Sequence, residues 1–212
     1  NLTHLDIGDT PLIKAAPLPD LPSKQVMIVG AQGAKRVSFE EIAAIPVPEA
    51  TYKESGTVSF NPCPYSDLIT AARSIYTEIL DTEPLYETYA IAKNGDEFAG
   101  KLVYPYTSKR GTVHENYGIS VVLRSSYNNN VAPSGADGQD TFICANGMMS
   151  GKHAWKARQT AGMAEAIVSH LRGSAGQATM KAGALIDLLD DWSEIPCADL
   201  MFYAYLGILR GR

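Results

Sequence analysis

The chain has 212 residues, of which 45% are hydrophobic and 19% charged, and its net charge of −5 argues against a uniformly basic nucleic-acid binder. Its three cysteines lie far apart, and neither a CxxC nor an HExxH motif occurs, so we expect free thiols in a reducing compartment and no metal site. No run of 18 apolar residues and no signal-peptide pattern is present, so the sequence predicts a cytoplasmic protein that does not enter a membrane.

The first 24 residues predict a proline-rich extended arm, because proline neither continues a helix nor donates to a sheet ladder. Residues 25–29 (QVMIV) predict a short buried strand. The following GAQGAKR loop lacks the GK[ST] ending of a phosphate-binding loop, so no nucleotide cofactor is expected. Ser38 and Glu41 have the spacing of a capping box, which predicts a short helix over residues 39–44.

Residues 57–80 predict a strand followed by the clearest helix of the chain. The strand covers residues 57–60, and Ser66 is the expected N-cap of the helix. Apolar residues then recur at helical spacing and form one face, which predicts a helix that covers a sheet. They are Leu68, Ile69, Ala72, Ile75, Tyr76, Ile79 and Leu80.

The next segment alternates with a period of two, which is typical of strands. Asn94-Gly95 predicts a tight hairpin turn between strands at about 85–93 and 97–106. A third strand is expected at about 117–127 and, after a long polar loop, a fourth at about 139–145. These connections predict an α+β fold in which an antiparallel four-stranded meander packs on helices.

The stretch TFICANGMMSG (residues 141–151) predicts the end of the fourth strand and a sharp turn at Asn146-Gly147. A long helix is expected to follow at once, with a basic first turn and a pause near residues 172–176. We therefore predict three parts. They are the arm (1–24), an α+β core domain (25–172) and a C-terminal helical segment (173–212).

The charge of the chain is uneven. Residues 101–172 contain eight Lys or Arg against four Asp or Glu, a net charge of +4, and the remainder has ten against nineteen, a net charge of −9. Cations that alternate with aromatic residues on a sheet suit single-stranded nucleic acid, whose phosphates pair with cations and whose bases stack. The candidate binding residues are Lys101, Tyr104, Tyr106, Lys109, Arg110, Arg124, Lys152, His153, Lys156 and Arg158.

Three short segments resemble a family of phage- and plasmid-encoded proteins of unknown function, over about residues 57–165. They are residues 124–128 (RSSYN), 142–146 (FICAN) and 158–160 (RQT). This chain departs from the family at Tyr127, Ala145 and Gln159, which replace a histidine, an acid and a histidine, so an acid–base role is absent at these positions.

The order of elements is similar to that of the single-strand annealing recombinases of phages and the Rad-type annealers. The resemblance implies a phage or mobile-element protein of the host cytoplasm that binds single-stranded DNA during recombination or replication. It also implies a homo-oligomer, because such annealers act as rings or filaments, and it implies no catalytic residue.

Two other classes of function remain open from the sequence. One is a structural or regulatory protein that acts through its arm and its apolar C-terminus. The other is an enzyme acting on nucleic acid or on a small anion, with Cys144, His153 or the acids between Asp187 and Glu194 in its site. We expect Cys144 to pack in the core, as buried cysteines usually do, and the acids to form an exposed helix face.

Overall fold

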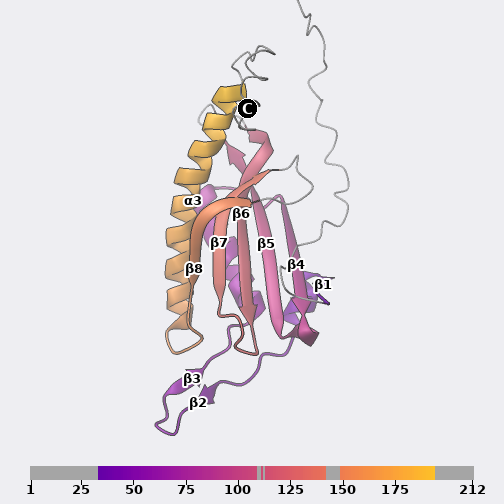
Figure 1. Cartoon of the computed structure of the whole chain (residues 1–212), viewed down its shortest axis with the longest axis vertical. Coiled ribbons are helices and arrows are strands. Elements are labelled where there is room, and N and C mark those ends of the chain that lie inside the picture. Colours follow the sequence, from indigo (N-terminus) through magenta and orange to yellow (C-terminus); the bar gives the residue numbers. More distant parts are fainter. Residues whose placement is uncertain (1–32, 109–110, 112, 142–148, 194–212) are drawn as a thin grey trace, which may run out of the picture.

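The computed structural model describes residues 33–108, 111, 113–141 and 149–193. It shows a six-stranded antiparallel sheet with two long helices on one side (Figure 1). The elements are β1 (Lys35–Val37), α1 (Phe39–Ala43), β2 (Thr51–Tyr52), β3 (Val58–Phe60), α2 (Tyr65–Leu80), β4 (Tyr86–Ala92), a 3-10 turn (Lys93–Gly95), β5 (Glu97–Thr107), β6 (Val113–Ser126), β7 (Ser134–Thr141), β8 (Met149–Lys156) and α3 (Met163–Ser193). The α+β class is therefore confirmed.

The strands of the main sheet follow the order β1-β4-β5-β6-β7-β8, and every neighbouring pair is antiparallel. From β4 onward the chain is a meander, as predicted, but the sheet has six strands where the sequence predicted four. The extra strands are β1 at one edge and β8 at the other, with β7 beginning earlier than expected. β2 and β3 form a separate small hairpin.

Most local predictions between residues 38 and 107 are confirmed. Ser38 and Glu41 form the expected capping box, in which the Glu41 amide donates to Ser38 Oγ over 3.2 Å and the Ser38 amide donates to Glu41 Oε2 over 2.8 Å. Asn94 adopts a left-handed conformation with a φ of 59°, as the hairpin turn requires. The expected cap at Ser66 is wrong, because α2 begins at Tyr65.

The prediction of a long polar loop before the fourth strand is wrong, because the later part of that segment belongs to β7 (Ser134–Thr141). Gly135 and Asp137 disfavour a strand by intrinsic propensity, yet β7 is hydrogen-bonded on both sides, by β6 and β8. The Asp137 carboxylate is buried and accepts a hydrogen bond from Ser174 of α3. Tertiary pairing therefore outweighs the local preference of this segment.

The prediction of a helix with a basic first turn directly after residue 151 is also wrong. Residues 149–156 form β8, and α3 begins only at Met163. Exposure alternates from Ala154 to Ala157, with Trp155 and Ala157 buried, which is the period of a strand. The expected pause near residues 172–176 is absent as well, since α3 runs unbroken through them. The proposed boundary at residue 173 thus falls inside a helix.

The core lies between the sheet and the two helices. Figure 1 shows α2 behind the strands and α3 alongside β7 and β8. Tyr76 of α2 stacks on Tyr104 of β5 with ring centroids 5.9 Å apart, and Leu171 of α3 is fully buried. Among the described helices, none is both long and apolar enough to cross a bilayer.

Several predicted segments lie outside the described residues. They are the arm, the strand at 25–29, the cysteines Cys144 and Cys197, Lys109 and Arg110, and most of the apolar C-terminus.

Candidate functional site

The two faces of the sheet differ because side chains alternate along each strand. On β5, Phe98 and Tyr104 point toward α2, where Phe98 stacks on Tyr65 and the Tyr104 hydroxyl donates to the Arg73 carbonyl over 3.3 Å. Ala99 and Lys101 occupy the alternate positions, so they lie on the face opposite the helices. We call this second face the open face.

Six residues of the open face form one line that crosses all six strands, which we call the transverse row. The register pairs each member with the next one along the line. The members are Arg36, Ala90, Ala99, Arg124, Ser134 and Lys156. With neighbouring strands about 4.8 Å apart, the row is about 24 Å long.

Three members of the transverse row are exposed cations. Arg36 lies on β1, Arg124 on β6 and Lys156 on β8, and the residues between them are small. Among the residues that the structure describes, none forms an ion pair with any of these three side chains. Three free positive charges aligned on one face are suited to holding an extended polyanion.

Lys101 lies one line further along the strands, where it pairs with Thr88 on β4 and Val122 on β6. The next line contains Val103 and Ser120, and both are fully buried. On the opposite side of the transverse row, Ser126 is buried and its hydroxyl accepts from the Val131 amide over 2.7 Å. The exposed and half-buried positions of the open face around Arg124 therefore lie within two lines, which we call the accessible strip, although Ala90 and Ala99 within it are buried.

One acid, Glu97, lies at the margin of this strip. Its carboxylate accepts from the Lys93 ammonium over 2.6 Å. Hydrogen bonds from Lys93, and secondarily from Asn130 and Asn128, hold the pKa of Glu97 below its ordinary range. The negative charge of Glu97 is therefore matched locally by Lys93, which reduces its repulsion of an anion on the transverse row.

The prediction that Tyr104 and Tyr106 lie beside the cations of the sheet is wrong. Tyr104 is fully buried under α2, and Tyr106 also points toward the helices, where its hydroxyl donates to Asp187 of α3 over 3.3 Å. Burial is the main cause that raises the pKa of Tyr104 to about 12. Neither ring shares a face with Lys101 or Arg124, so neither is placed to stack on a base beside them.

The other predicted residues divide into three groups. Arg158 is exposed in the loop between β8 and α3. Lys152 and His153 lie on β8, where His153 pairs with Asp137 in the ladder. Lys109 and Arg110 lie outside the described residues, between β5, which ends at Thr107, and β6, which begins at Val113. Arg36 was missed, because it lies alone in a three-residue strand far from the basic span.

Two of the three segments on which the resemblance rests, residues 124–128 and 158–160, meet at one end of the sheet, and the third, residues 142–146, lies outside the described residues. The Gln159 side chain donates to the Ser126 carbonyl over 2.9 Å, and the Gln159 carbonyl accepts from the Asn61 amide over 2.8 Å. The Tyr127 hydroxyl accepts from the first amide of α2, that of Tyr65, over 3.2 Å. Burial raises the pKa of Tyr127. Tyr127 and Gln159 thus serve packing and hydrogen bonding at this end of the sheet.

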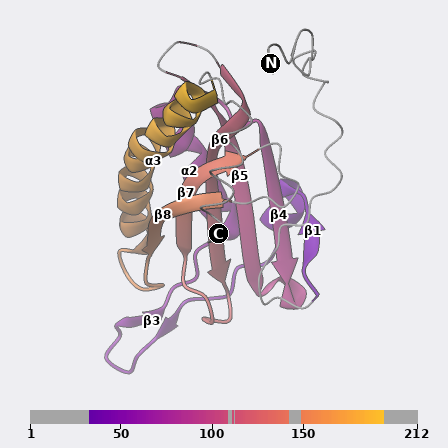
Figure 2. The ribbon, with the colours of Figure 1, turned by 45° about the horizontal axis from the view of Figure 1, so that its top comes forward.

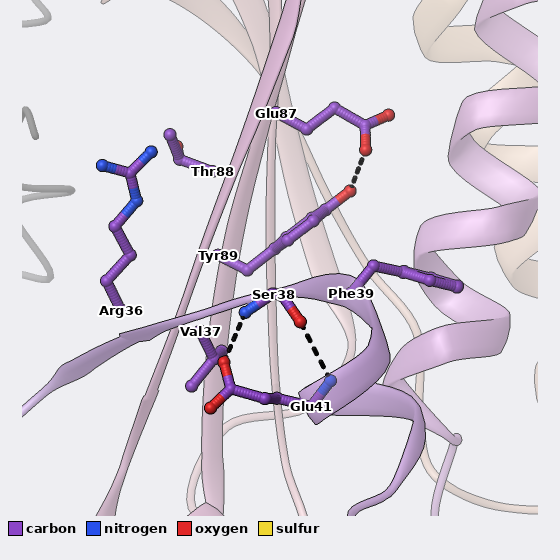
Figure 3. Close-up of a pocket in the computed structure, with 8 residues that line it drawn as sticks. All are labelled: Arg36, Val37, Ser38, Phe39, Glu41, Glu87, Thr88 and Tyr89. Carbon is purple, nitrogen blue, oxygen red and sulfur yellow. Dashed lines mark hydrogen bonds between the residues drawn. The ribbon is translucent and has the colours of Figure 1, made fainter.

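A shallow depression of about 510 Å³ lies beside the Arg36 end of the transverse row (Figure 3). Its polar groups are largely bonded to one another: Ser38 pairs with Glu41, and the Tyr89 hydroxyl donates to Glu87. Figure 3 shows Arg36 extending away from these pairs, beside Thr88. Among the residues that line this depression, Arg36 is the cation, and none of the described acids forms an ion pair with it.

Cysteine and metal chemistry have little support in the described part of the chain. Cys63 is buried, and burial, with a smaller contribution from Asp67, raises the pKa of its thiol to about 12. A thiol at that pKa is protonated at neutral pH and is a poor nucleophile. Within the described ranges, no group of three or more His, Cys, Asp or Glu is placed to hold a metal ion.

The environment of Glu87 predicts that the free energy of unfolding of the protein depends on pH. It accepts from Arg73 Nε over 2.7 Å and from Arg73 Nη2 over 2.6 Å, a bidentate pair that ties α2 to β4. Burial alone would raise the pKa of Glu87, but the bonds from Arg73 and Tyr89 outweigh it and leave the pKa below its ordinary value. A lowered pKa in the folded state contributes stability that is present at neutral pH and is lost as the pH falls through that pKa.

We therefore expect Glu87→Gln to lower the free energy of unfolding at pH 7 by about 1–3 kcal/mol. The difference from the wild type should shrink at acid pH, where Glu87 is protonated. Urea unfolding at neutral and at acid pH measures this. Glu78→Gln is the control, because Glu78 belongs to an exposed ion pair with Arg172 and should change stability little at either pH. A Glu87→Gln difference that is constant with pH would contradict the assignment.

Comparison with protein-family models, with curated proteins and with solved structures found no match to this chain.

Proposed function

We propose that this protein binds single-stranded nucleic acid on the open face of its sheet. The observation that carries the proposal is the alignment of Arg36, Arg124 and Lys156 along one line across six strands, with Lys101 beside it. Phosphate contacts from Lys and Arg supply most of the sequence-independent affinity for nucleic acids. Arginine also presents a planar fork of donors that fits a phosphate.

The width of the accessible strip favours a single strand over a duplex. Residues on the same face of a strand are about 7 Å apart, so two lines of the open face accommodate one phosphate backbone. In a duplex, grooves about 6 and 12 Å wide separate the two phosphate backbones. The strip therefore contacts one backbone of a duplex at a time. Strand annealing and self-association stay predictions from the resemblance, because they require properties beyond this strip.

The test is fluorescence anisotropy with a labelled oligothymidine, titrated at two salt concentrations, with a duplex as a competitor. We expect salt-sensitive binding that prefers the single strand. The double variant Arg124→Ala/Lys156→Ala should weaken binding about tenfold and flatten the slope of log K against log salt by about 1.4, which is about 0.7 for each lost phosphate contact.

The matched control is Lys35→Ala/Arg172→Ala, which removes the same charge from exposed ion pairs with Glu41 and Glu78 elsewhere on the surface. It should bind like the wild type. Equal loss in both double variants would mean that net charge, rather than the open face, attracts the oligonucleotide. An absence of binding at low salt would overturn the proposal.

A further inference from the structure

We infer that the bound strand runs across the β-strands, along the transverse row, from Lys156 at one edge of the sheet to Arg36 at the other. The inference rests on the proposed function and adds the direction of the strand and the far end of the site. Arg36 is the deciding residue, because it is remote in sequence from the other cations and lies on the opposite edge strand. The tilted view of Figure 2 shows β1 and β8 on opposite sides of the central strands.

Along β6, the positions of the open face next to Arg124 offer no second cation, since they are Val122 and Ser120 on one side and Ser126 on the other. Going from Arg124 along β6 on the open face, the second position reached is Ser120, which is fully buried together with its partner Val103. In the other direction, the first position is Ser126, which is buried and hydrogen-bonded to Val131. A strand laid along β6 would therefore meet one cation, Arg124, over this interval, whereas the transverse row presents three.

The path across the strands has exposed cations at both ends. Lys156 at the β8 edge, Arg124 in the middle and Arg36 at the β1 edge are all exposed. Two strand spacings separate Lys156 from Arg124, about 10 Å, and three separate Arg124 from Arg36, about 14 Å. Ala90 and Ala99, between Arg124 and Arg36, are buried, and Ser134 is half-buried. All three side chains are short, so a backbone that bridges the exposed cations passes above them.

The length of the row sets the length of the ligand. A strand that keeps the duplex rise of about 3.4 Å per nucleotide needs about seven nucleotides to cover 24 Å, and a more extended strand needs fewer. A thymidylate trimer therefore reaches from Lys156 to Arg124 but does not also reach Arg36. A thymidylate decamer covers the whole row.

The experiment measures Kd and its salt dependence for the trimer and the decamer, the trimer by competition against a labelled decamer. Arg36→Ala should weaken decamer binding about threefold to tenfold and reduce its salt slope by about 0.7, while leaving the trimer unchanged. Arg124→Ala should weaken both oligonucleotides. Lys35→Ala is the control for Arg36→Ala, because Lys35 is its neighbour on β1 at the alternate position and pairs with Glu41.

Three outcomes would overturn the inference. If Arg36→Ala leaves the decamer unchanged while Arg124→Ala/Lys156→Ala weakens it, the site is confined to β6–β8 and the proposed function stands without the transverse path. If Arg36→Ala weakens the trimer as strongly as the decamer, Arg36 lies within the primary contact and is not its far end. If the wild type binds neither oligonucleotide at low salt, the proposed function fails as well.

Discussion

Gly135→Val should destabilise the protein by about 3 kcal/mol or more, one of the largest effects expected from a single substitution outside the binding strip. Gly135 pairs with Trp155 across β7 and β8, and the indole lies directly over the glycine. A Cβ added at residue 135 would lie 2.7 Å from three atoms of that indole, a distance at which the ring must move.

The ring has little freedom to move. Trp155 is buried and stacks on His170 of α3 with ring centroids 5.7 Å apart, so its displacement also disturbs the contact between β8 and the helix. Urea unfolding followed by circular dichroism measures the stability, and tryptophan fluorescence in a Trp192→Phe background reports the environment of the Trp155 indole. Gly135→Ala should show a smaller effect of the same sign.

Gly173→Ala provides the control of opposite sign. Gly173 lies within α3, and an added Cβ there meets no atom within 4 Å. Alanine is favoured over glycine inside a helix by about 1 kcal/mol, so Gly173→Ala should stabilise the protein by up to that amount. Gly135→Val at wild-type stability would show that Trp155 does not lie over β7.

The sequence predicts best the elements whose local pattern agrees with their tertiary setting. Residues 66–80 repeat apolar side chains at helical spacing, and α2 buries that face against the sheet. The hairpin at Asn94-Gly95 is fixed by a turn that few other residues can adopt. Both follow from short-range preferences, and both are confirmed.

The elements that the sequence missed depend on pairing between distant segments. β7 contains two glycines and two aspartates, and it becomes a strand because β6 and β8 supply hydrogen bonds on both sides. Among the described side chains of β8, exposure alternates from Ala154 to Lys156, whereas Trp155, Met163, Ile167 and Leu171 recur in the sequence at a spacing that also suits a helix. Neither segment contains a local signal strong enough to decide its conformation.

The candidate site shows the same division. A period of two is enough to place Tyr104 and Tyr106 on one face of β5 and Lys101 on the other. The alignment of Arg36 with Arg124 cannot be predicted in this way, because it depends on the register of β1 on β4, of β4 on β5 and of β5 on β6. Register is set by the whole buried face of a sheet and is not contained in any one strand.

Tyr127→Ala should lower the free energy of unfolding by about 3–5 kcal/mol, as removal of a buried aromatic ring usually does. The Tyr127 ring stacks on Tyr65 with centroids 3.9 Å apart and nearly parallel planes, and Tyr65 in turn stacks on Phe98 of β5. These rings connect the end of β6, the start of α2 and the sheet. Their loss would open the end of the sheet at which Gln159 also packs.

Tyr127→Phe separates the ring from its hydroxyl. The hydroxyl accepts from the Tyr65 amide at the start of α2, whose N-cap, Pro64, makes no side-chain hydrogen bond. Because this hydroxyl replaces a missing cap, Tyr127→Phe should cost about 1 kcal/mol, the usual value of an N-cap bond. Thermal and urea unfolding of the two variants give the two contributions.

The same pair of variants separates stability from binding. Tyr127 follows Arg124 closely in sequence, but its ring is buried between α2 and the sheet, away from the exposed cations of the transverse row. Oligothymidine affinity per folded molecule should therefore be unchanged in Tyr127→Phe, even though its stability falls. A fully folded Tyr127→Phe that loses binding would place the hydroxyl in the ligand site and would contradict its assignment as a helix cap.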